Sequence, residues 1–346
     1  KDMKKRHTIL LAAAILCAAA CSKAPVSGLN DASKRYFDAW AQVNIPGAEQ
    51  TELGSYIIER TDGDGIEIGD SAYIRCNYTI RNLNGTVQKT TSATVAQQIG
   101  SYNETYFYGP MVWARLENSL YAGIEELIEG MHVGMKVKAA IPGWLITTKR
   151  YSKPELYLKN VTGTDTIYEI EVTDAFSDVT QHELDSIARF LRREYPMIDP
   201  ADTVDSERNA WGLYYITEKY SDAPDSTYND ESKIYFNYTG RLLNGTVFDT
   251  SIERVAKDAG IYNASKTYGP TYITWYAEGY KNTTMGSDAS STIDGFAYAL
   301  YNMKPHEKGK VIFHSLRGYS YSGSGSTIPA YSPLIFELEL VDNPDE

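Results

Sequence analysis

The sequence predicts an α+β fold made of two copies of one domain. Each copy is expected to be a mostly antiparallel, twisted sheet wrapped on a short helix and preceded by another helix. The first observation is a repeat: residues 77–91, NYTIRNLNGTVQKTT, return 160 positions later as residues 237–251, NYTGRLLNGTVFDTS. The same shift relates the tripeptide YGP at 108–110 to that at 268–270. This period has the size of a domain, and a chain of 346 residues is long enough for two of them.

Alternation of apolar and acidic residues is the second observation. It is clearest in residues 168–172, YEIEV, and 336–340, FELEL. A period of two with acidic outer positions is typical of strands that are buried on one face of a sheet. The Asn-Gly pairs at 84–85 and 244–245 lie between such runs and predict hairpin turns.

Helices are expected at the start of each unit and once inside each sheet. Thr180 and Glu183 have the spacing of a capping box ahead of a helix that ends at Pro196. Short internal helices are expected near 124–130 and 295–301. The apolar faces of the leading helices are predicted as Tyr36, Trp40 and Val43 in the first unit, and Leu184, Ile187, Ala188, Leu191 and Tyr195 in the second.

The N-terminal segment has the features of a targeting signal. Basic residues at 4–6 precede an apolar run at 9–20 that is too short to span a bilayer. The run ends in the sequence AAAC, which resembles a bacterial lipobox. We therefore expect residues 1–20 to be a lipoprotein signal peptide and Cys21 to be lipidated, although a plain secretory signal would share most of these features. Several acyl chains on Cys21 would provide a stable membrane anchor.

Charge and cysteine content narrow the classes of partner. Without residues 1–20, which carry four basic residues and one acidic residue, the net charge falls from −12 to −15. This balance disfavours nucleic acid and anionic headgroups as partners. Cys76 would then be the only cysteine besides Cys21, so no intrachain disulfide is expected, and its strand position predicts a buried apolar role. No phosphate-binding or dinucleotide motif is present, and no cofactor or metal is predicted.

The second unit resembles the FKBP-type peptidyl-prolyl cis-trans isomerases. The resemblance rests on five segments in family order, which cover most of residues 209–342, whereas the first unit matches more weakly. The segments are GLYYITEK (212–219), IYFNYTGRLLNGTVFDTS (234–251), IDGFAYALYNM (293–303), RGYSYSGSGSTIP (317–329, called the flap loop below) and LIFELELVD (334–342).

This resemblance implies a proline-binding pocket in the second unit. Its walls would be aromatic, its floor would be a Phe where the family usually has Trp, and a backbone N–H would bind a peptide carbonyl. The implied residues are Tyr238, Phe248 and Phe336 as walls, Phe296 as floor, Ile293 as the N–H donor, Asp249 at the rim, and Tyr321 and Ile328 from the flap loop.

The first unit departs from this pattern. Tyr78 is retained, but Gln88 and Lys89 replace the Phe and Asp, Ile124 takes the floor position, and residues 143–153 lack the Tyr-x-Tyr of the flap loop. A polar lining cannot desolvate a prolyl ring without a cost of about a few kcal/mol. The first unit is therefore expected to be inactive.

The second unit also departs from the family. Residues 252–292 are a long insertion where the family has a short strand with another pocket aromatic. Tyr272, Trp275 or Tyr276 could replace that aromatic, or the insertion could cover the pocket. Pro305-His306 resembles a further, two-residue insertion.

These features lead to a membrane-anchored peptidyl-prolyl isomerase or folding helper whose activity lies in the second domain. The expected partners are proline-containing segments of envelope proteins. The expected location is the outer membrane, facing the periplasm, with surface exposure left open. Two other functional classes are compatible with the sequence: a non-catalytic chaperone or binding module of the same fold, and a glycan-binding surface lipoprotein. The predicted organisation is a signal peptide (1–20), a tether and helix (21–50), a degenerate domain (51–178), a helical linker (179–208) and a domain with a complete pocket (209–346).

Overall fold

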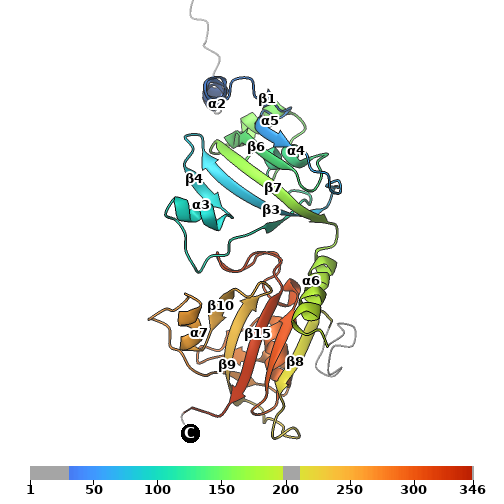
Figure 1. Ribbon diagram of the computed structural model, residues 1–346, viewed down its shortest axis with the longest axis vertical. Coiled ribbons are helices and arrows are strands. Elements are labelled where there is room, and N and C mark those ends of the chain that lie inside the picture. The colour runs from blue at the N-terminus through green and yellow to red at the C-terminus, as the bar shows by residue number, and fades with distance from the viewer. Residues whose placement is uncertain (1–30, 198–210, 345–346) are drawn as a thin grey trace, which may run out of the picture.

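The computed structural model describes residues 31–197 and 211–344. The predicted signal peptide and Cys21 lie outside these residues, as do the first part of the tether and the end of the linker. The described chain forms two domains, each with its own antiparallel sheet, arranged one after the other along the long axis of the molecule (Figure 1). The predicted α+β class is confirmed.

The two sheets share one topology. In the first domain the strand order is β1-β2-β6-β7-β3-β4, and β5 also pairs with β3. In the second domain it is β13-β12-β11-β9-β15-β14-β8, and β10 also pairs with β9. The series β2-β6-β7-β3 therefore corresponds to β8-β14-β15-β9, as the predicted duplication requires. The strands of the first domain are β1 (Glu49–Gln50), β2 (Tyr56–Thr61), β3 (Tyr73–Asn82), β4 (Val87–Thr90), β5 (Met111–Ala114), β6 (Lys136–Ile141) and β7 (Thr166–Phe176). Those of the second are β8 (Leu213–Lys219), β9 (Ser232–Leu242), β10 (Val247–Thr250), β11 (Thr271–Trp275), β12 (Thr284–Met285), β13 (Ser290–Ser291), β14 (Lys308–Phe313) and β15 (Leu334–Val341).

Both predicted hairpins are present. Gly85 and Gly245 adopt positive φ angles of 88° and 90°, a region that favours glycine. The two turns close with equivalent backbone hydrogen bonds, from Asn82 N–H to the Thr86 carbonyl and from Leu242 N–H to the Thr246 carbonyl. Local turn chemistry thus determines the register of β3 with β4 and of β9 with β10.

Each sheet encloses one short helix, as predicted. The helix is α4 in the first domain and α8 in the second, and both bury their apolar residues in the core of their own domain. The buried positions 168, 170 and 172 of β7 and 336, 338 and 340 of β15 confirm the predicted alternation. Cys76 is fully buried in the first core, and burial raises the pKa of its thiol. The helices are α2 (Asp31–Asn44), α3 (Ala93–Gln98), α4 (Ala122–Ile128), α5 (Pro154–Asn160), α6 (Val179–Glu194), α7 (Glu253–Asp258) and α8 (Asp294–Asn302), with 3₁₀ turns η1 (Gly143–Leu145), η2 (Tyr280–Asn282) and η3 (Ser315–Arg317).

Helix α2 buries a different face from the one predicted. Phe37, not Tyr36, is fully buried, and its ring contacts those of Trp40, Tyr56 and Trp144. Tyr36 is 63% exposed. The predicted stripe was wrong by one position because tertiary contacts of Phe37 decide the rotation of this helix.

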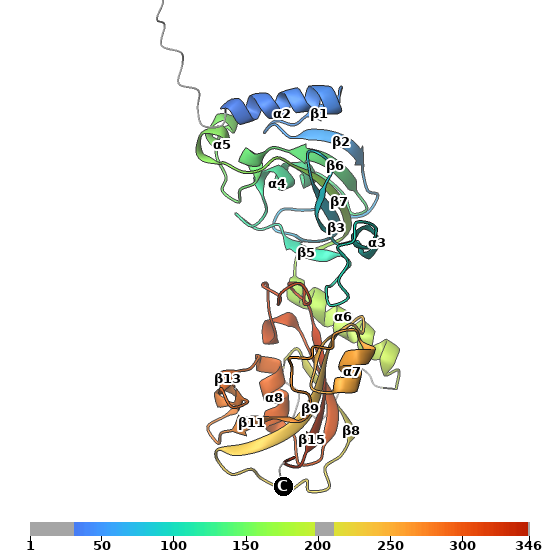
Figure 2. The same cartoon turned by 90° about the vertical axis from the view of Figure 1, so that its left-hand side faces the viewer.

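Helix α6 connects the domains and packs on the outer face of the second sheet (Figure 2). Ile187 and Leu191 are fully buried there, as expected. The predicted capping box was wrong: Asp178 is the N-cap and accepts a hydrogen bond from the Gln181 N–H at 3.0 Å. Glu183 is instead buried against the second domain. Within the described ranges, no helix has the length and apolar character needed to cross a membrane.

Candidate proline-binding site

Four aromatic rings from three strands and a helix meet inside the second domain. Phe296 of α8 is central: its ring lies 5.9 Å from that of Tyr238 and 4.7 Å from that of Phe336. Phe248 of β10 packs edge-on against Phe336 at 5.5 Å. Tyr238, Phe296 and Phe336 are buried, and Phe248 is half-buried. The structure therefore brings together the predicted walls and floor.

Phe248 reaches this cluster because of a β-bulge and a glycine. The pairing of β10 with β9 shifts between Val247 and Asp249, which re-aims the residue between them. The opposite position is Gly240, where an added Cβ would lie 2.4 Å from Cε2 of Phe248 and 3.0 Å from Cε1 of Phe336. A side chain at position 240 would thus occupy the space that the two rings need.

A charged pair forms part of the rim. Tyr238 donates its hydroxyl to Oδ2 of Asp249 at 2.7 Å, and Lys266 donates to Oδ1 of the same carboxylate. The ammonium group of Lys266 also lies 5.7 Å from the centre of the Tyr238 ring. Burial, and then the neighbouring Asp249, raise the pKa of the Tyr238 hydroxyl, so Tyr238 stays a neutral donor.

Ile293 is the N-cap of α8, one turn before the floor residue Phe296. Among the residues that the structure describes, its backbone N–H donates no hydrogen bond, so it is available to a ligand carbonyl. Ile328 of the flap loop is 5% exposed and belongs to the same apolar cluster. Tyr321 is 71% exposed, whereas Tyr319 packs against the cluster. The ligand-binding roles of Ile293 and Tyr321 remain predictions.

The insertion at 252–292 contributes to the core and to the rim of the site, but its aromatic rings do not enter the cluster of four rings. Its strand β11 pairs with β9, which places Ile273 in the core. Tyr272 contacts Tyr235, and Trp275 stacks on Tyr301 at 4.9 Å. Neither ring joins Phe248 and Phe336. The insertion instead contributes Lys266 to the rim.

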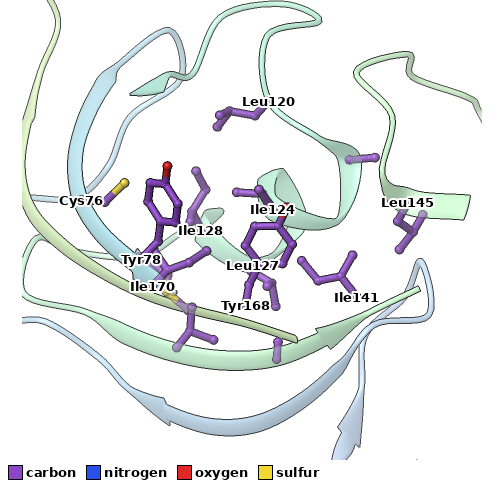
Figure 3. Close-up of a cluster of buried hydrophobic side chains, with 14 of the residues drawn as sticks. Cys76, Tyr78, Leu120, Ile124, Leu127, Ile128, Ile141, Leu145, Tyr168 and Ile170 are labelled. Atoms are coloured by element: carbon purple, nitrogen blue, oxygen red, sulfur yellow. The ribbon is translucent and has the colours of Figure 1, made fainter. Parts of the chain in front are cut away.

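The corresponding region of the first domain is filled by packed apolar side chains. Figure 3 shows Tyr78 and Tyr168 packed with Ile124 and its helix neighbours in a continuous core. In the paired strands, Ile80 lies opposite Tyr168, as Gly240 lies opposite Phe336. Ile80 thus takes the place of the glycine, and Gln88 is exposed.

Sequence reasoning missed three residues of the site. Gly240 could have been found from the repeat, because residue 80 is Ile where residue 240 is Gly. Tyr319 was visible in the Tyr-x-Tyr of the flap loop, but the choice between its two tyrosines needs coordinates. Lys266 gave no sequence signal, since it lies 17 positions from Asp249 within an insertion.

Comparisons with known proteins show what the second domain is similar to. A family model described as FKBP-type peptidyl-prolyl cis-trans isomerase matches residues 225–341. A peptidyl-prolyl cis-trans isomerase of Bos taurus, FKBP10, is 29% identical over 113 residues, which are 33% of this chain and 15% of that protein. An FK506-binding protein of Neisseria meningitidis serogroup B is 29% identical over 109 residues, 32% of this chain and 77% of that protein. A solved structure of the three FKBP domains of wheat FKBP73 covers 83% of this chain and 94% of its own, at 15% identity and a TM-score of 0.26.

Proposed function

We propose that the second domain, whose residues 225–341 match the family model described as FKBP-type peptidyl-prolyl cis-trans isomerase, isomerises X–Pro bonds in polypeptides and that the first domain does not. The observation that carries this proposal is the convergence of Tyr238, Phe248, Phe296 and Phe336 on one apolar site beside a free backbone N–H.

The chemistry needs no nucleophile and no proton transfer. Rotation about an X–Pro bond faces a barrier of about 18–20 kcal/mol, because amide resonance resists twisting. Water hydrogen-bonded to the amide carbonyl supports the planar, charge-separated form, so a dry aromatic site disfavours that form. The Ile293 N–H would hold a carbonyl of the peptide while the prolyl ring lies among the aromatic rings. Catalysis results if the site binds the twisted amide more tightly than either planar isomer.

The first domain lacks the means to do this. Ile80 fills the space that Gly240 leaves open, and the exposed Gln88 replaces the ring of Phe248. The β-sheet and helix are retained, so this domain keeps a structural role.

A peptide isomerisation assay on residues 22–346 tests the proposal. The wild-type protein should accelerate cis-to-trans conversion of a Leu-Pro tetrapeptide, and Phe248→Gln should lower kcat/KM at least about tenfold because a polar side chain then lines the site. Asp249→Lys, the residue of the first copy, should also lower it. The matched control is Gln88→Ala in the first domain, which should have wild-type activity. Failure of the wild-type protein to exceed the rate in buffer would contradict the proposal and favour a non-catalytic binding module.

We further propose that Cys21 carries lipid and holds the domains at the cell envelope, where proline-containing segments of envelope proteins would be the substrates. The support is the sequence of residues 4–21. Expression of the full chain with radiolabelled palmitate should label the wild-type protein and not Cys21→Ala. Equal labelling of both proteins, or recovery of the wild-type protein without lipid from the soluble fraction, would refute the anchor.

A further inference from the structure

A cavity of about 410 Å³ lies between the two domains. The first domain contributes Arg75 and Phe107, helix α6 contributes Arg189, and the second domain contributes Leu242 and the segment 329–333 that follows the flap loop. The site therefore exists only where the domains meet. Its volume suits a few side chains of a polypeptide.

This cavity shares a wall with the proline-binding site. Phe107 lines the cavity and also packs against the apolar cluster that contains Phe336 and Ile328. Its backbone N–H donates to the carbonyl of Ser326 in the flap loop at 2.8 Å. Figures 1 and 2 show the loop between α3 and β5, which carries Phe107, extending to the second domain. The cavity therefore adjoins the flap loop, which also carries Ile328 of the proline-binding site.

Two further contacts hold the walls of the cavity together. Tyr73 of the first domain packs edge-on against Tyr331 of the second at 5.4 Å. Glu183 of α6 accepts hydrogen bonds from the backbone N–H and the hydroxyl of Ser315, at 2.5 and 2.7 Å. The cavity is thus preformed, which reduces the entropic cost of binding a flexible chain.

The charge of the cavity is opposite to that of the whole chain. Three arginines line it. Arg193 is paired with Glu194, with Nε and Oε1 2.7 Å apart, whereas Arg75 and Arg189 are exposed and neither has a carboxylate partner in the described part of the chain. Arg189 donates only to the hydroxyl of Ser186, at 2.8 Å. The carboxylate of Glu183, also in the lining, is occupied by Ser315. The formal net charge of the chain is −12, so this cavity is locally positive on an acidic protein. Because guanidinium groups bind carboxylates strongly, the two arginines without a carboxylate partner in the described residues favour an acidic ligand.

We propose that this cavity is a subsite for the polypeptide segment that flanks the isomerised proline, and that Arg75 and Arg189 select an acidic side chain in that segment. The proposal rests on the isomerase function proposed above. It gives the inactive first domain a role, because Arg75 and Phe107 of that domain complete the substrate-binding surface of the second.

Matched peptides test the subsite. Each has an Ala-Leu-Pro-Phe core extended by four residues on its N-terminal or C-terminal side, with either Glu-Glu or Gln-Gln in the extension. For one of the two sides, kcat/KM of the Glu peptide should exceed that of the Gln peptide by about tenfold at low salt, and less at high salt. The Glu/Gln ratio should fall to about one in Arg75→Gln/Arg189→Gln. It should stay at the wild-type value in Arg192→Gln, which removes an exposed charge from the same helix but not from the cavity.

The ratio is internal to each protein, so differences in folded fraction cancel. A ratio near one on both sides in the wild-type protein, or a ratio unchanged in the double variant, would overturn the subsite while turnover of the Gln peptides upholds the isomerase. If no peptide is isomerised, the proposed function fails. Fluorescence anisotropy with the labelled Glu peptides then tests the cavity as a binding site. Binding that is lost in Arg75→Gln/Arg189→Gln supports the subsite. Binding that this variant retains, or no binding to the wild-type protein, refutes the subsite.

Discussion

Gly240 lies directly under the ring of Phe248, and the absence of a side chain at position 240 lets that ring approach Phe336. The two domains differ at this point, because Ile80 occupies the equivalent position of the first sheet. The residue at this position of the strand is therefore one of those on which the aromatic site depends.

Replacement of this glycine should disrupt the site. In Gly240→Ala the new methyl group would collide with Phe248, and overpacking of this kind costs about 1–3 kcal/mol unless the ring moves away. We expect kcat/KM for a Leu-Pro peptide to fall at least about tenfold, with the far-ultraviolet circular dichroism spectrum retained. Ile80→Val, the control in the first domain, should leave kcat/KM unchanged. Wild-type activity in Gly240→Ala would mean that the ring of Phe248 does not bind substrate.

Lys266 should influence which residue is preferred before the proline. It neutralises Asp249 at the rim, so Lys266→Met leaves a carboxylate whose remaining donors, the Tyr238 hydroxyl and the Thr250 backbone N–H, are uncharged. The ratio of kcat/KM for a Lys-Pro peptide to that for a Glu-Pro peptide should rise by about fivefold, and the effect should weaken as salt is added. Lys257→Met breaks a comparable ion pair on α7, with Glu253, and should not change the ratio. No change in Lys266→Met would place this pair outside the reach of the substrate.

Glu183 should make stability depend on pH. Burial raises the pKa of its carboxyl above the ordinary value of 4.5, so the folded chain holds this proton more tightly than the unfolded chain. Its contribution to the free energy of unfolding must therefore decline as the pH rises from about 4.5 through the raised pKa. Glu183→Gln cannot ionise and lacks this decline. Urea unfolding at pH 4 and pH 7.5 should show wild type losing stability relative to Glu183→Gln as the pH rises.

The exposed Glu194→Gln on the same helix is the control and should run parallel to wild type between the two pH values. A difference between wild type and Glu183→Gln that is constant or grows with pH would show that the carboxyl ionises without cost in the folded protein.

His306 should stabilise the protein more strongly at acidic pH than at basic pH. Its two ring nitrogens lie 2.8 Å from carboxylate oxygens of Asp342 and Asp222, and these two partners raise the pKa of the imidazole above 6.5. The stabilisation is complete below the unfolded pKa and is lost as the pH rises through the folded pKa. His306→Gln should therefore destabilise the protein at pH 5.5 and have less effect at pH 9, as measured by urea unfolding. His132→Gln in the other domain is the control for loss of a histidine, and an equal effect of His306→Gln at both pH values would exclude the ion pairs as its cause.

Much of the fold could be predicted because its signals are local. Apolar–acidic alternation identified β7 and β15, and the Asn-Gly pairs identified two hairpins, since side-chain direction and turn geometry depend on adjacent residues. Prediction failed where a residue's role depends on distant partners. Glu183 has the spacing of a capping residue, but its carboxylate binds Ser315, 132 positions away. Phe37 is buried instead of Tyr36 because Trp144 packs on it.

The candidate site divides in the same way. The repeat and the family resemblance identified Tyr238, Phe248, Phe296 and Phe336, and the structure brings their rings together. Lys266 was missed because its counterpart in the first repeat is Tyr106, so the repeat gives no sign of a cation beside Asp249. The contact of Phe107 with the flap loop was missed because the residue belongs to the other domain.

By itself, the sequence determined that one domain is duplicated and that only the second copy has aromatic residues at all of the wall and floor positions of the pocket. Periodicity, turn dipeptides and residue replacements are properties of short segments, so they can be read without coordinates. Only the tertiary structure decided that Gly240 makes room for Phe248, that Lys266 reaches Asp249 and that the two domains line a cavity in which two arginines have no carboxylate partner among the described residues. These relationships are distances between segments far apart in the chain, and they are set by the packing of whole sheets and helices against one another.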